Sequence, residues 1–278
     1  MVNRKSYKRV LTIAGSDSGG GAGIQADIKT ISACGCYAAS AITAITVQNT
    51  LGVTAVQGLP IDIITGQIAA VIDDIGVDAI KIGMLHSSEV IAGVREMLLK
   101  YRVRNVVLDP VMVSTSGHRL IEESAIESLR RDLLPLARVI TPNIPEAEIL
   151  LGEKLRQQSD LPEAARRLGE RVHTSVLLKA GHLTEDELVD IFYDHETGEI
   201  HRLPSVRVHT PNTHGTGCTM SSAFAAMLAR GYELPEAARR AKDYINQAII
   251  AGADYQIGHG HGPVHHFWNM EQDNSLIH

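Results

Sequence analysis

Short apolar runs alternate with longer amphipathic runs along most of the chain. The short runs are rich in β-branched residues and carry few polar positions, as is typical of strands buried on both faces. They lie at residues 9–14, 78–82, 105–108, 138–140 and 175–178. Between them, apolar residues recur on one helical face, as in the sets Ile64, Ile68, Val71, Ile72, Ile75 and Ile126, Leu129, Leu133, Leu134. Repeated strand–helix units predict an α/β fold, a three-layer αβα sandwich around a mostly parallel central sheet.

Two regions depart from this alternation. Residues 38–47 and 53–58 predict additional extended structure near the ligand-binding end of the sheet. Residues 189–193 and 199–203 flank a turn at Glu196-Thr197-Gly198. We therefore expect an antiparallel hairpin there, at one edge of the sheet.

Two helical patterns, at residues 218–229 and 234–251, close the sequence. No linker, internal repeat or low-complexity segment interrupts the chain. The sequence therefore predicts a single domain over residues 1–278, with peripheral tails at 1–8 and 268–278.

The composition limits the classes of partner. Of the 278 residues, 44% are hydrophobic and 21% are charged, which is ordinary for a globular protein. The net charge of −6 provides no basic field for nucleic acid or for a membrane surface, so we expect neither as a partner. The sequence contains no signal-like leader and no apolar run of about 18 residues. We therefore expect a cytoplasmic protein with reduced cysteines.

The cysteines and the C-terminal histidines do not form a metal-binding pattern. Cys34, Cys36 and Cys218 match neither a zinc motif nor an even disulfide framework, and the first two fit small core positions. The histidines near the end of the chain are His259, His261, His265, His266 and His278. No carboxylate accompanies them at ligand spacing, so we interpret this segment as a mobile or edge-packed tail.

The corner Thr213-His214-Gly215-Thr216-Gly217-Cys218 precedes an apolar helical run. Two glycines and the start of a helix predict a nest of backbone N–H groups that binds an anion. Cys218 would lie in the first helical turn, where a thiolate is stabilised, so we expect a lowered pKa. The local chemistry allows a nucleophile, a base or a small packed residue.

A glycine-rich loop follows the first predicted strand. Residues 14–23 contain five glycines and lead into a helix that carries Asp27. The loop is not a P-loop, because no Gly-Lys-Ser/Thr follows, and a dinucleotide fingerprint would need an acidic residue after a second strand. It either lets the backbone approach a small ligand, with Asp27 near a hydroxyl group, or it is a plain turn.

Other strand ends carry polar residues that could bind a phosphorylated ligand. Asp109 follows one strand, and Asn143 and Glu146 lie on one face of a first helical turn, where they could hold a hydrated Mg²⁺. Asn143 and Glu146 equally fit a helix-capping box. Lys179 could place a point charge on a phosphate or lie on the surface.

Gln48 and Met84 also lie at the ends of predicted elements. An amide that both donates and accepts hydrogen bonds, beside a flexible thioether, suits a small flat heteroaromatic ring.

Together, these corners resemble the ribokinase-like superfamily, and within it the hydroxymethylpyrimidine and phosphomethylpyrimidine kinases of thiamine biosynthesis. The matching segments are residues 14–17, 20–27, 48–50, 81–85, 109–112, 141–147, 179–182, 213–219 and 262–267. The resemblance implies an αβα sandwich and MgATP-dependent phosphoryl transfer. The acceptors would be the hydroxymethyl group of a pyrimidine and then its monophosphate.

The resemblance also assigns a catalytic role to the glycine corner. Cys218 would be the base that accepts the proton of the substrate hydroxyl, where many ribokinase-like enzymes carry an aspartate. The backbone of Gly215, Thr216 and Gly217 would stabilise the transferring phosphoryl group.

Further residues carry over by position. The substrate-binding residues would be Gly15 and Asp27 at its polar end, Gln48 on its amino edge, and Met84 and Val111 on its ring. For the nucleotide, Lys179, Asn143 and Thr213 would contact ATP, while Asp109 and Glu146 would hold Mg²⁺ through water. The additional strands make a homodimer the expected assembly.

The sequence departs from the family pattern at Ser114-Thr115-Ser116-Gly117, where relatives often carry a basic residue. Three alternatives stay open: a pyridoxal-type kinase on the same scaffold, a Cys-nucleophile acyl-transfer enzyme that pairs Cys218 with His214 or His182, and a binding protein without catalysis.

Overall fold

A nine-stranded sheet runs through the centre of the computed structural model, which describes residues 5–112, 122–183 and 185–270. In chain order its strands are β1 (Arg9–Asp17), β2 (Tyr37–Asn49), β3 (Gly52–Gly58), β4 (Ala79–Ile82), β5 (Val106–Leu108), β6 (Val139–Ile140), β7 (Ser175–Leu178), β8 (Glu187–Tyr193) and β9 (Ile200–Val206). Across the sheet the order is β3-β2-β1-β4-β5-β6-β7-β8-β9. The six strands from β2 to β7 in this order are parallel, β3 and β8 run antiparallel to them, and β9 pairs antiparallel with β8. The predicted mostly parallel sheet and its edge hairpin are confirmed.

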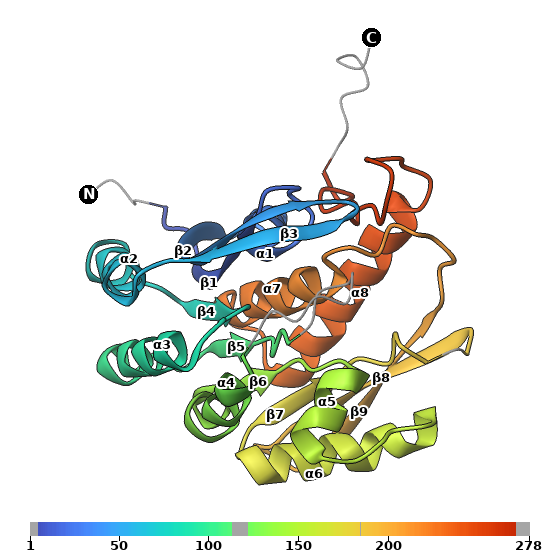
Figure 1. The fold of residues 1–278 in the computed structure, drawn as a ribbon. Coiled ribbons are helices and arrows are strands. Elements are labelled where there is room, and N and C mark those ends of the chain that lie inside the picture. Colours follow the sequence, from blue (N-terminus) through green and yellow to red (C-terminus); the bar gives the residue numbers. More distant parts are fainter. Residues whose placement is uncertain (1–4, 113–121, 184, 271–278) are drawn as a thin grey trace.

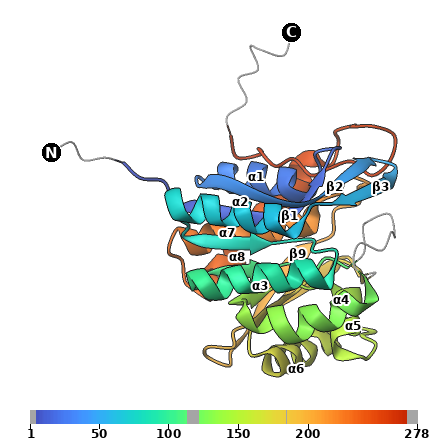
Figure 2. The ribbon, with the colours of Figure 1, turned by 60° about the vertical axis from the view of Figure 1, so that its left-hand side comes forward.

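Helices cover both faces of the sheet, as Figures 1 and 2 show. On one face lie α1 (Gly23–Ala33), α7 (Thr216–Ala229) and α8 (Leu234–Gly252). On the other lie α2 (Ile61–Asp74), α3 (Ser88–Tyr101), α4 (Glu123–Ser128), α5 (Ile144–Leu151) and α6 (Leu161–Val172). The predicted three-layer αβα sandwich is therefore confirmed.

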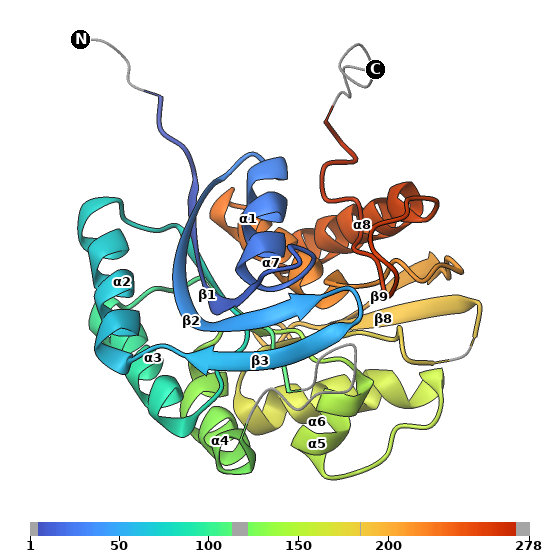
Figure 3. The same cartoon turned by 45° about the horizontal axis from the view of Figure 1, so that its top comes forward.

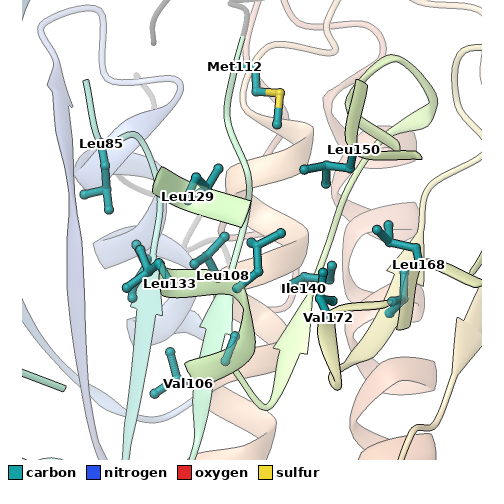
Figure 4. Close-up of a cluster of buried hydrophobic side chains, with 14 of the residues drawn as sticks. Leu85, Val106, Leu108, Met112, Leu129, Leu133, Ile140, Leu150, Leu168 and Val172 are labelled. Atoms are coloured by element: carbon teal, nitrogen blue, oxygen red, sulfur yellow. The ribbon is translucent and has the colours of Figure 1, made fainter. Parts of the chain in front are cut away.

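Alternate strand residues build two separate cores. Val107 of β5 packs toward α7 and α8, whereas its neighbours Val106 and Leu108 pack toward the opposite helices. Figure 4 shows the second core, where Leu108 and Ile140 lie among leucines of the covering helices. A strand buried on both faces needs apolar residues at every position, which explains the unbroken apolar runs in the sequence.

The helical pattern at residues 126–134 does not form one regular helix. α4 ends at Ser128 and continues as a π-helical turn (Leu129–Leu133) and a 3₁₀ turn (Leu134–Leu136). Pro135 lies in that last turn. Proline has no N–H to donate and clashes with the preceding turn, so the α-helical geometry cannot extend through it.

The β2–β3 hairpin extends past the end of β1, and the chain after α8 returns to it (Figure 3). We call residues 256–263 the C-terminal strap. The N–H groups of His259 and Gly260 donate to Thr50 Oγ1 at 3.2 Å, and that of His261 donates to the Thr50 carbonyl at 2.9 Å. A Cβ atom at Gly260 would overlap this carbonyl, so the close approach requires glycine. The C-terminal histidines thus include residues packed on the hairpin.

None of the described helices combines the length and the apolar character that crossing a membrane would require.

Candidate active site

A cavity of about 1040 Å³ opens at the carboxyl ends of the parallel strands. Ligands of open α/β sheets bind at this edge. All but one of the site residues expected from the sequence line it: Gly15, Gln48, Met84, Asp109, Val111, Asn143, Glu146, Lys179, Thr213, Gly215, Thr216, Gly217 and Cys218. The topology therefore brings together residues that lie up to about two hundred positions apart in the sequence.

The glycine corner forms the start of α7. Gly215 is the residue before the helix and has a left-handed backbone, with φ of 80°. A Cβ atom there would overlap the Gly21 carbonyl, so the corner packs directly on the glycine-rich loop. No side chain caps the helix, and Thr216 N–H bonds the Thr213 carbonyl at 3.3 Å. Helix geometry leaves the N–H groups of Gly217 and Cys218 for a bound anion.

Cys218 lines the cavity, but the expected lowering of its pKa is wrong. Burial raises the pKa of the thiol to about 11, and the carboxylates of Asp27 and Asp109 act in the same direction. The Lys81 ammonium and a hydrogen bond from the Gly23 N–H oppose this rise. Burial disfavours the charged form more than one helix terminus favours it, so the ligand-free site holds a neutral thiol.

Asp27 is the one expected site residue outside the cavity lining. It is fully buried, and its two oxygens lie 2.8 and 2.9 Å from Lys81 Nζ. The expected direct contact between Asp27 and the substrate is therefore not supported, because Lys81 occupies the position between Asp27 and the cavity. A lysine inside an apolar strand rarely lacks a buried acidic partner, and this was the available sequence signal.

Asp17 and His214 form a second network in the cavity lining; the sequence assigned no role to Asp17 and considered His214 only as a partner of Cys218 in the acyl-transfer alternative. Asp17 accepts hydrogen bonds from the N–H groups of Gly19 and Ala22, each at 2.8 Å, and lies 2.9 Å from His214 Nε2. Burial opposes ionisation of Asp17, but the bonds from His214 and the loop outweigh it and lower the pKa. The carboxylate thus fixes the glycine-rich loop. His214 Nε2 also lies 3.3 Å from the amide nitrogen of Gln48.

Asp109 and Lys179 form an ion pair beside the start of α7. Asp109 Oδ1 lies 2.8 Å from Lys179 Nζ and accepts a hydrogen bond from Thr141 Oγ1 at 2.9 Å. A Cβ atom at Gly217 would lie 3.3 Å from both Lys179 Nζ and Asp109 Oδ2. Burial opposes the charge on Lys179, but Asp109 and Glu146 raise its pKa, so it stays a cation. This wall combines a fixed cation with the helix terminus.

Asn143 and Glu146 form the capping box of α5. Asn143 Oδ1 accepts from the Glu146 N–H at 2.9 Å, and Glu146 Oε2 accepts from the Asn143 N–H at 2.8 Å. Both residues still line the cavity, so capping does not exclude a ligand role. Burial raises the pKa of Glu146 to about 7, against the lowering effect of Lys179.

Within residues 5–112, 122–183 and 185–270, no group of three or more His, Cys, Asp or Glu side chains could hold a metal ion directly. The nearby carboxylates of Asp109 and Glu146 instead suit a hydrated Mg²⁺ whose remaining ligands are water and phosphate. The departure at residues 114–117 lies outside the described residues.

Comparison with known proteins identifies close relatives. The family model for phosphomethylpyrimidine kinase matches residues 17–265. A hydroxymethylpyrimidine/phosphomethylpyrimidine kinase of Rhizobium meliloti is 50% identical over 95% of this chain and 98% of its own. The bifunctional thiamine biosynthesis protein ThiED of Geobacter sulfurreducens is also 50% identical, over 94% of this chain but only 53% of its own. The structure of a Bacillus subtilis pyridoxal kinase bound to ADP superposes with a TM-score of 0.86 at 39% identity, covering 94% of this chain and 98% of that one.

Proposed function

The chain belongs to the phosphomethylpyrimidine kinase family, and from this premise we propose that Cys218 is the base of its phosphoryl-transfer reaction. The protein is an ATP-dependent kinase of thiamine biosynthesis that acts on hydroxymethylpyrimidine and on its monophosphate. One observation supports the assignment above all. The thiol and the Lys179–Asp109 pair both lie at the start of α7, beside the N–H groups suited to a phosphoryl group.

In the proposed step, the thiol of Cys218 first loses its proton to solvent, and the resulting thiolate takes the proton of the substrate hydroxyl. The freed oxygen forms a bond to the γ-phosphorus of ATP, the bond to the β-phosphate oxygen breaks, and ADP leaves. The N–H groups of Gly217 and Cys218 stabilise the charge on the transferring group, and Lys179 neutralises the nucleotide phosphates. Positioning and charge neutralisation supply most of the rate in this chemistry.

The pyrimidine ring would lie between Gln48, Met84, Val111 and Gly15. A Cβ atom at Gly15 would overlap the methyl group of Met84, so glycine lets the thioether pack directly against the backbone there. The Thr46 hydroxyl lies 3.0 Å from the Gln48 side-chain oxygen and holds the amide in place. A fixed amide can read the amino group and ring nitrogen of an aminopyrimidine.

Asn143 and Thr213 would contact the nucleotide. Asp109 and Glu146 would hold Mg²⁺ through water, and the ion would supply charge neutralisation for the phosphates. The thiol base requires a reducing compartment, and on that ground we place the protein in the cytoplasm.

We also propose a homodimer that uses the β2–β3 hairpin. Ile45, Val47 and Val56 expose 49%, 59% and 48% of their surface on this element. An apolar patch of this kind is typical of an interface. Sedimentation analysis of the protein should give twice the chain mass.

The alternatives differ in how well the geometry supports them. Because a pyridoxal kinase has a similar structure, pyridoxal stays an alternative substrate. An acyl-transfer enzyme would pair Cys218 with a histidine. His214 Nε2 instead lies 2.9 Å from Asp17 Oδ2, and no hydrogen bond in the described part of the chain joins Cys218 to His214 or His182. We therefore favour the kinase.

The first prediction concerns substrate and base together. ATP consumption should be fastest with hydroxymethylpyrimidine or its monophosphate, and a clear preference for pyridoxal would contradict the proposal. Cys218→Ala should keep pyrimidine binding in calorimetry while turnover falls by about 10² or more, as expected for loss of a general base. Cys36→Ala removes a buried thiol away from the cavity and serves as the matched control. Near-normal turnover of Cys218→Ala would show that the thiol only lines the cavity.

A further inference from the structure

We propose that Lys81, held in place by Asp27, is the fixed cation that stabilises the negatively charged sulfur of Cys218. Lys81 and Asp27 would then be positioning residues, which act on the reaction through Cys218. Only the effect on turnover rests on the proposed role of Cys218 as the base. The effect on the sulfur itself can be measured without the kinase reaction.

The Lys81–Asp27 pair is fixed beneath the cavity. Both side chains are fully buried, and Lys81 Nζ contacts both carboxylate oxygens at 2.8 and 2.9 Å. Thr12 Oγ1 donates to Asp27 Oδ2 at 2.6 Å, and Ser222 Oγ donates to Asp27 Oδ1 at 2.7 Å. Each oxygen therefore has two donors, which holds the carboxylate in one orientation. Of the two ionic side chains, only Lys81 also lines the cavity.

The helices place Cys218 directly next to this pair. Ser222 lies four residues after Cys218 on α7, so the two side chains share one helix face. Gly23 begins α1 four residues before Asp27, and its N–H favours the ionised form of the Cys218 sulfur. The two helices are joined in this region by the hydrogen bond between Ser222 and Asp27. Cys218 therefore lies one helical turn before Ser222, the residue that bonds the carboxylate holding Lys81.

Four charged side chains face the sulfur from the surrounding elements. The cations are Lys81 from β4 and Lys179 from the end of β7, and the carboxylates are Asp27 from α1 and Asp109 from the end of β5. Lys179 pairs with Asp109 and faces the expected phosphates, whereas Lys81 is enclosed. The pKa of Lys81 is raised, because its interactions with Asp27, Cys218 and Asp109 outweigh its burial. It stays charged through the reaction and does not accept the proton.

Folding stability alone does not explain a fully buried ion pair. Removing two charges from water costs about as much as their attraction returns, and apolar replacements are often as stable. A buried charge beside a reactive group is instead a common way to adjust that group. Here the nearby group is a thiol that must become an anion in the proposed step.

The test is the pH dependence of Cys218 alkylation by iodoacetamide in the full-length, ligand-free protein, followed by mass spectrometry of the Cys218 peptide. The test variant is Lys81→Met/Asp27→Asn, which removes both charges together and leaves no unpaired buried ion. Arg9→Met/Asp78→Asn is the matched control. It removes another ion pair, at 3.0 Å, that joins β1 to the residue before β4 at the opposite end of these strands.

In the test variant, the midpoint of alkylation should rise, so that the reaction at a given lower pH is slower than in the wild type, because the effect of Lys81 on the sulfur exceeds the opposing effect of Asp27. Turnover should fall by about tenfold or more while KM for the pyrimidine changes little. The control should match the wild type in both measurements. A wild-type midpoint in the folded test variant would overturn the proposal, because a purely structural role would change thermal stability without moving the midpoint.

Asp27→Asn alone provides a second measurement with the opposite expected direction. It removes a carboxylate that faces the sulfur and keeps the cation, so the midpoint should fall. An unchanged or higher midpoint would overturn the proposal. If the midpoints move as expected but Cys218→Ala retains turnover, the counter-ion role stands and the assignment of Cys218 as the base fails.

Discussion

At the scale of single residues, the reaction depends on how readily one partly buried thiol in the cavity lining loses its proton. In the ligand-free site burial raises the pKa of Cys218 to about 11. A base must be deprotonated to act, and kcat/KM reports the ionisation of the free enzyme. We therefore expect kcat/KM to rise between pH 6.5 and 8.5, by up to about tenfold per unit. Steady-state kinetics across this pH range test the prediction, and a kcat/KM that does not change with pH would contradict it.

Replacing the thiol with a carboxylate should change this profile. Cys218→Asp introduces a group whose ordinary pKa is about 3.9, so an upward shift of the size that Cys218 shows still leaves it mostly ionised at pH 7. Turnover should exceed that of Cys218→Ala, and the alkaline rise should disappear. A Cys218→Asp profile that still climbs above pH 7 would show that another group causes the rise.

Single residues also show where the sequence was informative and where it was not. The corner at Gly215 was predictable because a left-handed backbone next to a helix start leaves a clear glycine pattern. The raised pKa of Cys218 was not, because it depends on how deeply other elements enclose the sulfur. The burial of Asp27 against Lys81 was not predicted for a similar reason. Its partner Lys81 lies 54 positions away in the sequence, and only the fold brings them together.

At the scale of elements, the start of α5 combines a structural and a chemical role in one side chain. Glu146 closes the capping box and also lines the cavity, where burial raises its pKa to about 7. The unfolded chain would ionise this carboxyl near pH 4.5. Stability is therefore lost progressively as the pH rises from about 4.5 to 7. The capping bond from Asn143 partly offsets this cost.

Glu146→Gln should remove the pH-dependent cost and keep an oxygen for the Asn143 N–H. In the ligand-free protein its Tm should exceed the wild-type value at pH 8, by about 2–4 °C per kcal/mol regained, and match it near pH 4.5. Glu148 on the same helix is the control, because its bond from Lys154 lowers its pKa. Glu148→Gln should therefore be less stable than the wild type at pH 8. Equal Tm values for Glu146→Gln and wild type at pH 8 would contradict the argument.

Most elements could be predicted from periodicity, and the exceptions have local causes. β7 coincides with a run of β-branched and apolar residues, because a strand buried on both faces accepts a polar residue only where a partner satisfies it. The break after Ser128 was missed, since the apolar spacing continues through it while Pro135 prevents α-helical geometry. The spacing of apolar residues indicates which face of a helix is buried. It does not indicate whether the helix is α, π or 3₁₀.

At the scale of the whole molecule, the C-terminal strap packs on the N-terminal hairpin that carries one wall of the cavity. The C-terminal strap bonds Thr50 at the tip of the β2–β3 hairpin, and its Gly262 carbonyl accepts from the His214 N–H at 3.0 Å. One segment thus connects the hairpin that carries Gln48 with the glycine corner. No local pattern predicts this contact, because it joins residues about 210 positions apart.

Gly260→Ala should loosen this connection, because the added methyl group would overlap the Thr50 carbonyl. We expect KM for the pyrimidine to rise by roughly an order of magnitude, through displacement of Gln48, with a smaller change in kcat. Gly66→Ala places a methyl group in open space on α2 and serves as the control. Steady-state kinetics of both variants test this, and an unchanged KM for Gly260→Ala would show that the strap does not hold the hairpin.

Because two of the three helices that cover one face of the sheet lie late in the sequence, that face stays uncovered until synthesis is nearly complete. Of α1, α7 and α8, only α1 is made early. Until α7 and α8 emerge from the ribosome, Val107, Val139 and Leu177 have few apolar partners, so the growing chain exposes a hydrophobic surface that chaperones can bind. The same late helix carries the phosphate-binding corner. An incomplete chain that lacks α7 therefore cannot transfer phosphate from ATP. We expect the product of a message truncated before α7 to be degraded by proteases and to have no partial kinase activity.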